Sequence, residues 1–415
     1  VFLSKMFGFT LSQKISLVGI GMGAEKTLTL EGKKALNEAE LLIGAKRMTE
    51  AVQKPGQMVL HEYRSEKIVE YIREHPKYRT VAIALSGDVG FYSGAKKLID
   101  QLDGNVEVIC GISSVVYFMS KIGLSWDDAK IVSAHGRNCN LISLIRHNPK
   151  VFSILGTEDG VAVLASRLVY YGMGDVTLYV GENLSYENEK IFHDKAANLT
   201  EYRGDALSVV TACNEKATPM SAVHGISDGE FLRGKAPMTK EEVRTVSLSK
   251  LRLSEDSVCY DVGAGTGSVS VEMALRAWMG QVYAIEKKED ALALLKENKK
   301  KFAVDNLVII PGVAPEAMTE LPAPTHAFIG GSSGNMQDII NLLLEKNPKV
   351  RIVINCITLE TVTEAMNAIR DFGLEDVDIV QLAAARSKSI GRYHMMMGEN
   401  PIYIISCSGR GEEIR

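Results

Sequence analysis

The stretch that decides the fold of the second half of the chain is Asp261-Val262-Gly263-Ala264-Gly265-Thr266-Gly267-Ser268. An apolar run at residues 257–262 predicts a strand before it, and residues 268–277 behind it have helical periodicity. Glycines at such a turn let the backbone approach a ligand closely, and the helix N-terminus offers unpaired N–H groups. Glu286 ends the next predicted strand, where its carboxylate can accept both hydroxyls of a ribose. The stretch therefore predicts a nucleoside-binding α/β domain.

The spacing of these glycines separates two classes of cofactor. A dinucleotide fingerprint requires a third glycine at position 268, where this chain has Ser268. The acid two residues before the first glycine resembles the loop of class I S-adenosylmethionine (SAM) methyltransferases. An NAD-linked oxidoreductase and a turn that binds nothing are the alternatives.

Both halves of the chain alternate strand and helix patterns. The second half predicts five parallel strands closed by an antiparallel pair at residues 377–382 and 402–407, a doubly wound sheet. Thr239, with Glu242 three residues on, has the pattern of a helix capping box. Residues 214–236 contain Pro and Gly without periodicity. We therefore expect a first domain at residues 14–213, a linker at 214–236 and a second domain at 237–415.

Small-residue loops follow three strands that are predicted in the first half. They are Gly19-Ile20-Gly21-Met22-Gly23, then residues 86–92 (SGDVGFY), then residues 111–114 (GISS). In an open α/β sheet, ligands bind at the carboxyl ends of the strands. The loops therefore predict a second ligand site.

Composition excludes several classes of protein. The 415 residues carry a net charge of -4, which argues against a dedicated nucleic-acid binder. No apolar run approaches the roughly 18–20 residues of a membrane span. The six cysteines form no C-x-x-C pair and lie near no histidine at zinc-ligand spacing, so we expect a cytoplasmic protein without a metal site.

The three small-residue loops of the first half, with the sequence around them, resemble those of the tetrapyrrole methylases, the class III SAM methyltransferases. The stretches that carry the resemblance are LVGIGMGAEKTLTLEGKKALNEAELLIGAKR (17–47), SGDVGFY, CGISSVVYF (110–118), SAHGR (133–137) and VGENLSYENEKI (180–191). The family has a bilobal fold with SAM between its lobes. The resemblance implies cofactor contacts at Met22, Asp88, Gly90, Phe91, Ser113, Ser114 and Leu155.

The second half resembles the decarboxylating corrin C15-methyltransferases. The matching stretches are GISDGEFLRGKAPMTKEEVR (225–244), DVGAGTGSVSVEMA (261–274), GVAPEA (312–317), FIGGSSG (328–334) and RSKSIGRYHMMMGENPIYII (386–405). The resemblance implies a second SAM site at Thr239, Gly263, Ala264, Gly265, Thr266, Gly267, Glu286 and Ala314. The family usually has Asp where Val313 stands, so one polar contact to adenine is expected to be missing.

Together the two modules resemble the bifunctional C5,15-methyltransferases of cobalamin biosynthesis. The implied substrate is a precorrin or cobalt-precorrin, a tetrapyrrole with several carboxylates. Such a substrate needs cationic anchors. The candidates are His135 and Arg137 in the first domain, and Lys240, Arg244, Arg386, Lys388, Arg392 and His394 in the second.

Other readings of the same folds remain open at this stage. RNA or protein could be the methyl acceptor, and a non-enzymatic SAM sensor is conceivable. Relatives of the two modules imply a homo-oligomer, a dimer or a tetramer. We expect neither a nucleic-acid nor a membrane partner.

Overall fold

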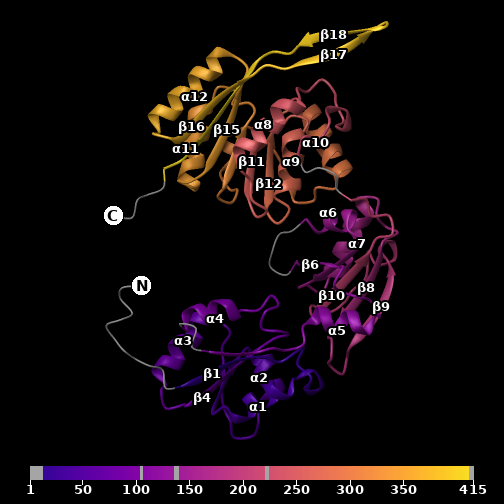
Figure 1. Ribbon diagram of the computed structural model, residues 1–415, viewed down its shortest axis with the longest axis vertical. Coiled ribbons are helices and arrows are strands. Elements are labelled where there is room, and N and C mark those ends of the chain that lie inside the picture. The colour runs from indigo at the N-terminus through magenta and orange to yellow at the C-terminus, as the bar shows by residue number, and fades with distance from the viewer. Residues whose placement is uncertain (1–12, 103–105, 135–139, 220–223, 411–415) are drawn as a thin grey trace. The chain divides into compact units, whose positions relative to one another are not determined.

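The computed structural model describes residues 13–102, 106–134, 140–219 and 224–410. The chain divides into two compact units, which are described separately. Unit 1 comprises residues 1–135, 150–166 and 175–213, and unit 2 comprises residues 136–149, 167–174 and 214–415. Figure 1 shows both units and labels many of their helices and strands.

The first sheet of unit 1 is parallel, with the strand order β3-β2-β4-β1-β5. Apolar residues fill both of its faces. Helices α3 and α4 contribute to the core on one face, and α1 and α2 to the core on the other. The elements are β1 (Lys14–Gly19), η1 (Glu25–Thr27), α1 (Leu30–Glu38), β2 (Leu41–Gly44), α2 (Lys46–Val52), β3 (Met58–His61), α3 (Ser65–Glu74), β4 (Thr80–Leu85), α4 (Ala95–Gln101) and β5 (Glu107–Ile109).

A second, mixed sheet follows in the order β6-β7-β10-β8-β9. Only β6 and β7 pair in parallel, and the remaining neighbours are antiparallel. The two sheets are the two lobes that the resemblance predicts. The elements are α5 (Ser114–Lys121), β6 (Lys130–Ser133), α6 (Leu141–His147), β7 (Lys150–Ile154), α7 (Gly160–Tyr170), β8 (Thr177–Glu182), β9 (Lys190–Lys195), η2 (Ala196–Asn198) and β10 (Ser208–Cys213).

The main sheet of unit 2 has the order β13-β12-β11-β14-β15-β19-β16. Its first five strands are parallel, and β19 is antiparallel to both β15 and β16. Helices α8, α9 and α10 pack on one face, and α11 and α12 on the other. The elements are η3 (Asp228–Glu230), α8 (Glu241–Leu251), β11 (Val258–Val262), α9 (Ser268–Arg276), β12 (Gln281–Glu286), α10 (Glu289–Phe302), β13 (Leu307–Pro311), η4 (Glu316–Met318), β14 (His326–Ile329), α11 (Met336–Lys346), β15 (Arg351–Cys356), α12 (Leu359–Asp371), β16 (Glu375–Leu382) and β19 (Ile402–Ser408).

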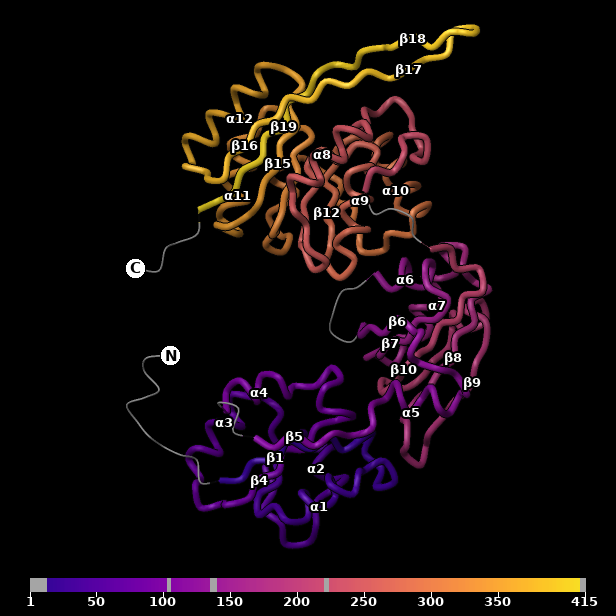
Figure 2. The backbone as a smooth tube through the Cα atoms, viewed as in Figure 1, coloured from indigo at the N-terminus to yellow at the C-terminus, as the bar shows by residue number. Residues whose placement is uncertain are grey.

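A separate hairpin projects from this sheet between β16 and β19. Its strands are β17 (Ala385–Ile390) and β18 (Tyr393–Gly398), which pair only with each other. Figure 2 shows the hairpin as a long arm that leaves the body of unit 2. No strand was predicted between residues 382 and 402.

The predicted fold class, two α/β modules, is confirmed, and one local detail is corrected. Helix α8 begins at Glu241 with Lys240 at its N-cap, and no side chain caps it. The capping box is therefore wrong, because Glu242 pairs with Arg386 instead of with its own helix terminus. The predicted antiparallel pair is confirmed: β16 pairs antiparallel with β19, and β19 in turn pairs antiparallel with β15.

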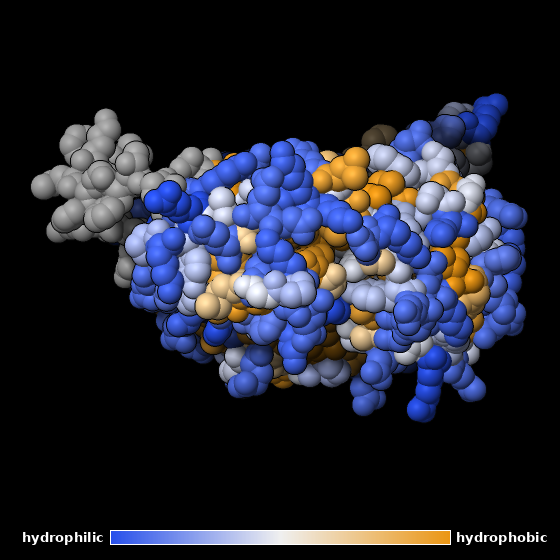
Figure 3. Space-filling model, turned by 90° about the horizontal axis from the view of Figure 1, so that it is seen from below, coloured by the Kyte–Doolittle hydropathy of each residue, from blue (hydrophilic) through white to orange (hydrophobic). Residues whose placement is uncertain are grey.

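No helix in the described ranges is long and apolar enough to cross a membrane. Hydrophilic residues cover most of the face seen in Figure 3, and hydrophobic residues show between them.

Candidate cofactor sites

The glycine loop of unit 2 has the backbone that its sequence predicts. Gly263, Gly265 and Gly267 all have positive φ angles, of 76°, 56° and 79°. At Gly265 a Cβ atom would lie 2.9 Å from the carbonyl oxygen of Pro237, so a larger residue would strike the neighbouring backbone. The loop turns directly from β11 into α9, whose N-cap is Gly267.

Glu286 lies at the end of β12 and faces the same loop. Its Oε2 accepts from the Gly265 N–H at 2.8 Å, and its Oε1 accepts from the N–H groups of Lys287 and Lys288 at 2.8 and 2.9 Å. The side chain is buried but lines the cavity above the loop. A carboxylate has about four lone-pair sites, so Glu286 keeps acceptor capacity for a hydroxyl.

A cavity of about 210 Å³ opens over the carboxyl ends of β11, β12 and β14. Of the predicted cofactor residues, Gly263, Gly265, Glu286 and Ala314 line it. Thr239, Ala264, Thr266 and Gly267 do not, and Thr266 is buried beneath the loop. The wall also contains residues that the sequence did not single out: Ala236, Pro237, Lys287, Lys288, Gly330, Gly331, Ser332 and Ser333. Val313 lines the cavity as well and is 43% exposed.

Asp261 lies below the loop, closed off from solvent. The Ser270 hydroxyl donates to its Oδ2, and Oδ1 has no hydrogen-bond partner in the described structure. Burial raises the pKa of this carboxyl to about 7, and the nearby Glu286 charge acts in the same direction. The acid that precedes the glycines, Asp261, is thus a buried group that supports the loop from beneath, and it does not line the cavity.

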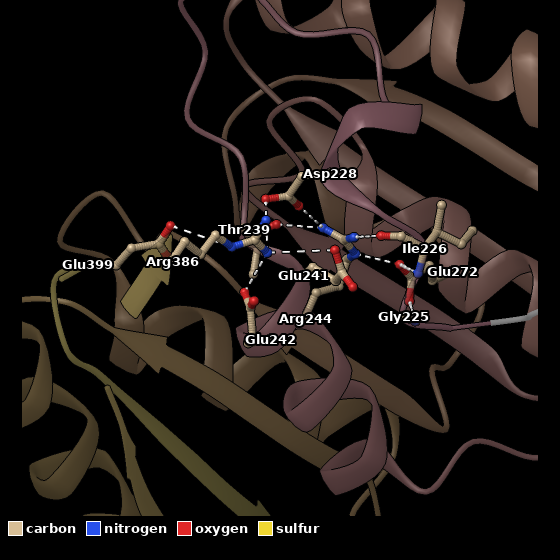
Figure 4. A network of polar contacts seen from close by, with 10 residues as sticks. All are labelled: Gly225, Ile226, Asp228, Thr239, Glu241, Glu242, Arg244, Glu272, Arg386 and Glu399. Carbon is tan, nitrogen blue, oxygen red and sulfur yellow. Dashed lines mark hydrogen bonds and ion pairs between the residues drawn. The ribbon is translucent and has the colours of Figure 1, made fainter. Parts of the chain in front are cut away.

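The prediction that Arg244 anchors a substrate carboxylate is wrong. Its guanidinium is fully buried and pairs with Glu272 of α9 and with Asp228, and it also donates to the carbonyl of Thr239 at 2.6 Å. A further bond runs to the Ile226 carbonyl. Figure 4 shows these groups converging on one side chain. Every direction around Arg244 is occupied by protein, so it does not offer a free cation to a ligand.

The network instead fastens the segment of residues 225–239, which we call the pre-helix segment. The N–H groups of Gly225 and Ile226 donate to Glu272 at 2.8 and 3.1 Å, and Arg244 holds the other end of the segment at Thr239. Between these points the segment supplies Ala236 and Pro237 to the cavity wall. The buried pair therefore positions one wall of the site.

The prediction that Arg386 anchors a substrate carboxylate is also wrong. Its Nη2 lies 2.7 Å from Glu242, 3.6 Å from Glu241 and 3.7 Å from Asp228, and its Nε is 3.9 Å from Glu399 (Figure 4). Four carboxylates already compete for this one charge, so it is not available to a polyanion. Arg386 joins the base of the hairpin to the N-terminus of α8 and to the pre-helix segment.

The other cations of the tail do not form the predicted cluster. Lys388 and His394 lie on opposite faces of the hairpin, because Lys388 pairs with Met395 and Ser389 with His394. Arg392 is at the tip, where its guanidinium contacts the hydroxyl of Tyr393. Lys240 is half-buried at the N-cap of α8.

The three loops of unit 1 meet as predicted. Gly21 and Gly87 exchange backbone hydrogen bonds, at 3.1 Å from Gly21 N–H and 2.6 Å from Gly87 N–H. A Cβ on Gly111 would lie 2.3 Å from the Gly87 carbonyl oxygen and 2.6 Å from Gly19. Asp88 joins the second and third loops, accepting from Gly90 N–H at 2.8 Å and from Gly111 N–H at 3.0 Å. Only glycines permit this contact of backbone on backbone.

A cavity of about 320 Å³ lies beside these loops in unit 1. Of the predicted residues, Met22, Phe91, Ser114 and Leu155 line it. Asp88, Gly90 and Ser113 do not; Asp88 holds the loops together, and Ser113 caps α5 by accepting from the Val116 N–H at 3.5 Å. His135 and Arg137 lie outside the described residues. The sequence did not single out Arg47, Tyr92, Asn183, Tyr186 or Ser208, which also line the cavity.

Comparison with known proteins now decides the family. A family described as "Precorrin methyltransferase domain" matches residues 230–408, and one described as "Tetrapyrrole (Corrin/Porphyrin) Methylases" matches residues 14–200. A probable cobalt-precorrin-6B C(15)-methyltransferase (decarboxylating) of Pyrobaculum calidifontis is 45% identical over 188 residues, which are 45% of this chain and 96% of that protein. The chain belongs to the precorrin methyltransferases.

Other members of this family give the same match. The cobalt-precorrin-6B C(15)-methyltransferase (decarboxylating) of Salmonella typhimurium is 40% identical and covers 46% of this chain and 99% of its own length. A crystal structure of precorrin-6y C5,15-methyltransferase from Geobacter metallireducens is 39% identical, with a TM-score of 0.42, over 45% of this chain and 96% of that one.

A signal for some of the missed wall residues was present in the sequence. The stretches GAKR and SSG, which contain Arg47 and Ser333, belong to the family resemblance, but nothing local marks them as wall residues. Pro237 was placed next to a linker because it follows an aperiodic segment. Within the described part of this methyltransferase, no three His, Cys, Asp or Glu side chains could hold a metal ion together.

Proposed function

We propose that the chain methylates a reduced, ring-contracted tetrapyrrole at two positions, using SAM at both. In this proposal the cavity of unit 1 serves C5, and the cavity of unit 2 serves C15 together with decarboxylation of the ring C acetate. The observation that carries it is the presence, in one chain of this family, of two separate cavities, each at the carboxyl ends of parallel strands and each bordered by glycine loops. The RNA, protein and NAD readings have no matching observation.

The residues of unit 2 fit a SAM molecule in several respects. The left-handed glycines leave room for a ligand against the loop, and Glu286 can accept hydroxyl groups at the edge of the cavity. Val313 presents an apolar surface where the family usually has Asp. Backbone around Ala314 and apolar packing would then hold the adenine. SAM would supply an activated methyl group.

The protein then needs no nucleophile of its own, because the meso carbons of such a macrocycle are enamine-like. Its contribution is to align methyl and carbon in a cleft poor in water, where proximity supplies much of the acceleration. In the decarboxylation the bond between the acetate methylene and its carboxyl breaks, carbon dioxide leaves, and the electron pair passes into the conjugated ring. In this proposal residues 14–213 methylate C5, and residues 237–415 methylate C15 and remove the carboxylate.

Calorimetry with S-adenosylhomocysteine tests the number of sites. The unmodified protein should bind two equivalents, and the Gly265→Arg variant should bind one, because its side chain would enter the cavity of unit 2. That variant should lose C15 methylation and decarboxylation and keep C5 methylation. Gly94→Arg is the matched control, since no atom lies within 4 Å of a Cβ added there. A single site in the unmodified protein, or loss of both activities in Gly265→Arg, contradicts the proposal.

The substrate can be tested with metal-free and cobalt-bearing precorrins. Each is incubated with SAM, and the products are read by mass: methyl gain alone for C5, methyl gain with loss of carbon dioxide for C15. If protein that binds S-adenosylhomocysteine methylates neither macrocycle, the proposed substrate class is wrong.

We also propose that the chain forms a homo-oligomer through the hairpin of β17 and β18. Pairing in the hairpin places Ile390, Tyr393, Met395 and Met397 on one face, and these side chains are 47–65% exposed. Exposed apolar patches of this kind mark interfaces. Sedimentation velocity of the Met395→Ser, Met397→Ser double variant should show a smaller species than the unmodified protein, with Met366→Ser, on α12, as control. Equal sedimentation of all three contradicts this assembly.

A further inference from the structure

The cavity of unit 1 carries a single charged side chain among its described lining residues, and that side chain is Arg47. It stands in the first turn of α2, exposed, and the described structure gives it no ion pair. Its Nη1 donates to the hydroxyl of Tyr186 at 2.6 Å, and its guanidinium carbon lies 5.8 Å from the centre of that ring. A guanidinium has five N–H donors, so most of its capacity is unused.

Tyr186 is held in place by a strained loop between β8 and β9. Asn183 and Ser185 have positive φ angles of 47° and 74°, which residues other than glycine rarely adopt. Two hydrogen bonds keep the backbone in this conformation. The Asn183 side chain donates to Asp205 at 2.7 Å, and the Ser185 N–H donates to Glu189 at 2.5 Å. Strain of this kind persists where surrounding structure over-determines it, and it concentrates at ligand sites.

The position of the tyrosine is further defined by Gly23 of the first glycine loop. A Cβ on Gly23 would lie 2.4 Å from the Tyr186 hydroxyl oxygen, and Gly23 has a φ of 118°. The loop that borders the predicted cofactor site therefore also seats the partner of Arg47. The result is an oriented cation at the rim of a largely apolar cavity.

We propose that Arg47 binds a peripheral carboxylate of the macrocycle and thereby holds this substrate at the site of C5 methylation. The inference rests on the proposed function. Arginine suits this task because its planar fork binds a carboxylate through two parallel hydrogen bonds. The hydrogen bond to the Tyr186 hydroxyl limits the directions that the fork can take. The methionine carboxylate of SAM has the same chemistry, and the experiment separates the two sources.

The test compares both reactions in the full-length chain. Arg47→Met keeps the length of the side chain and removes its charge. It should raise the KM of the tetrapyrrole for C5 methylation about tenfold, with kcat within about twofold and the KM for C15 methylation unchanged. Arg47→Lys should recover part of the loss. Lys46→Met is the matched control, since Lys46 is the neighbouring exposed cation and does not line the cavity.

Two further arms identify the carboxylate. The affinity for S-adenosylhomocysteine, measured by calorimetry, should be equal in the unmodified protein and in Arg47→Met. In the unmodified protein the carboxylate form of the tetrapyrrole should compete better than its methyl ester in C5 methylation, and in Arg47→Met this preference should shrink about tenfold.

An unchanged KM for C5 in Arg47→Met overturns the inference and leaves the proposed function standing. Weaker binding of S-adenosylhomocysteine in the variant also overturns it, because the cation would then serve the cofactor. Failure of the unmodified protein to methylate C5 overturns the proposed function and the inference together.

Discussion

Replacing Arg244 by Met tests whether the buried network positions the cofactor wall of unit 2. The change removes a fully buried charge and leaves the Glu272 carboxylate, with no exposed surface, without its cation. Breaking a buried pair in this way typically destabilises a protein by about 3–5 kcal/mol. Glu272 keeps its two backbone donors at Gly225 and Ile226, and Asp228 keeps Arg386 at 3.7 Å. The expected loss is therefore at the lower end, about 3 kcal/mol.

The assay must report on unit 2 alone, because one free energy of unfolding does not describe a chain with two compact units. The chain has two tryptophans, Trp126 in unit 1 and Trp278 in unit 2. In a Trp126→Phe background, urea titration followed by fluorescence reads Trp278. Arg252→Met is the control: it breaks the Arg252–Asp376 pair, whose side chains are 67% and 50% exposed, and should change the free energy by less than about 1 kcal/mol.

Two results would refute this reasoning. One is a loss in Arg244→Met no larger than in Arg252→Met. The other is a double variant, Arg244→Met with Glu272→Gln, that is no more stable than Arg244→Met alone, since removing the stranded charge should restore part of the loss. Arg244→Met should also bind S-adenosylhomocysteine more weakly at the site of unit 2, because the network no longer holds Ala236 and Pro237 in the cavity wall.

Three other predictions concern single residues at the two sites. Burial raises the pKa of Asp261 to about 7, so the folded state holds a proton that the unfolded chain releases near pH 4, and the free energy of unfolding of unit 2 should fall between about pH 4 and pH 7. Asp261→Asn should lack that part of the fall in urea titrations across this range; parallel curves for the two proteins would contradict it. Val313→Asp should tighten S-adenosylhomocysteine binding at unit 2 by up to about tenfold in calorimetry, and an unchanged affinity would show that adenine does not use this position. Gly111→Ala should remove the site of unit 1, lowering the stoichiometry from two to one with C15 methylation intact, whereas Gly94→Ala, placed in open space, should keep both sites.

Much of the fold could be predicted from the residues in their local order. The strands predicted at residues 257–262, 377–382 and 402–407 are observed, each within two residues of its predicted bounds. The positive φ angles of Gly263 and Gly265 follow from a property of the residue itself, which is the absence of a Cβ atom. The hairpin of β17 and β18 was missed because it has no buried face, and hydrophobic periodicity detects strands by the face that they bury.

The candidate sites divide in a similar way. The loops were predicted because parallel strands place their carboxyl ends at one edge of the sheet, and the family resemblance implied Met22, Phe91, Gly263 and Glu286 within them. The cations were predicted from charge and spacing alone, and that information does not identify a partner. Arg244 and Arg386 were therefore assigned to a substrate, although the fold surrounds them with carboxylates.

By itself the sequence determined the two α/β modules, their order and the glycine turns, because each depends on local periodicity or on the backbone freedom of a residue. Only the tertiary structure decided which charges are satisfied internally and which face a cavity. Arg244 and Arg47 are the same residue type, each in the first turns of a helix. One is closed in by Asp228 and Glu272, and the other donates to a tyrosine hydroxyl and has most of its donors unused. Segments far apart along the chain supply these neighbours, so the environment of each charge is set by long-range packing.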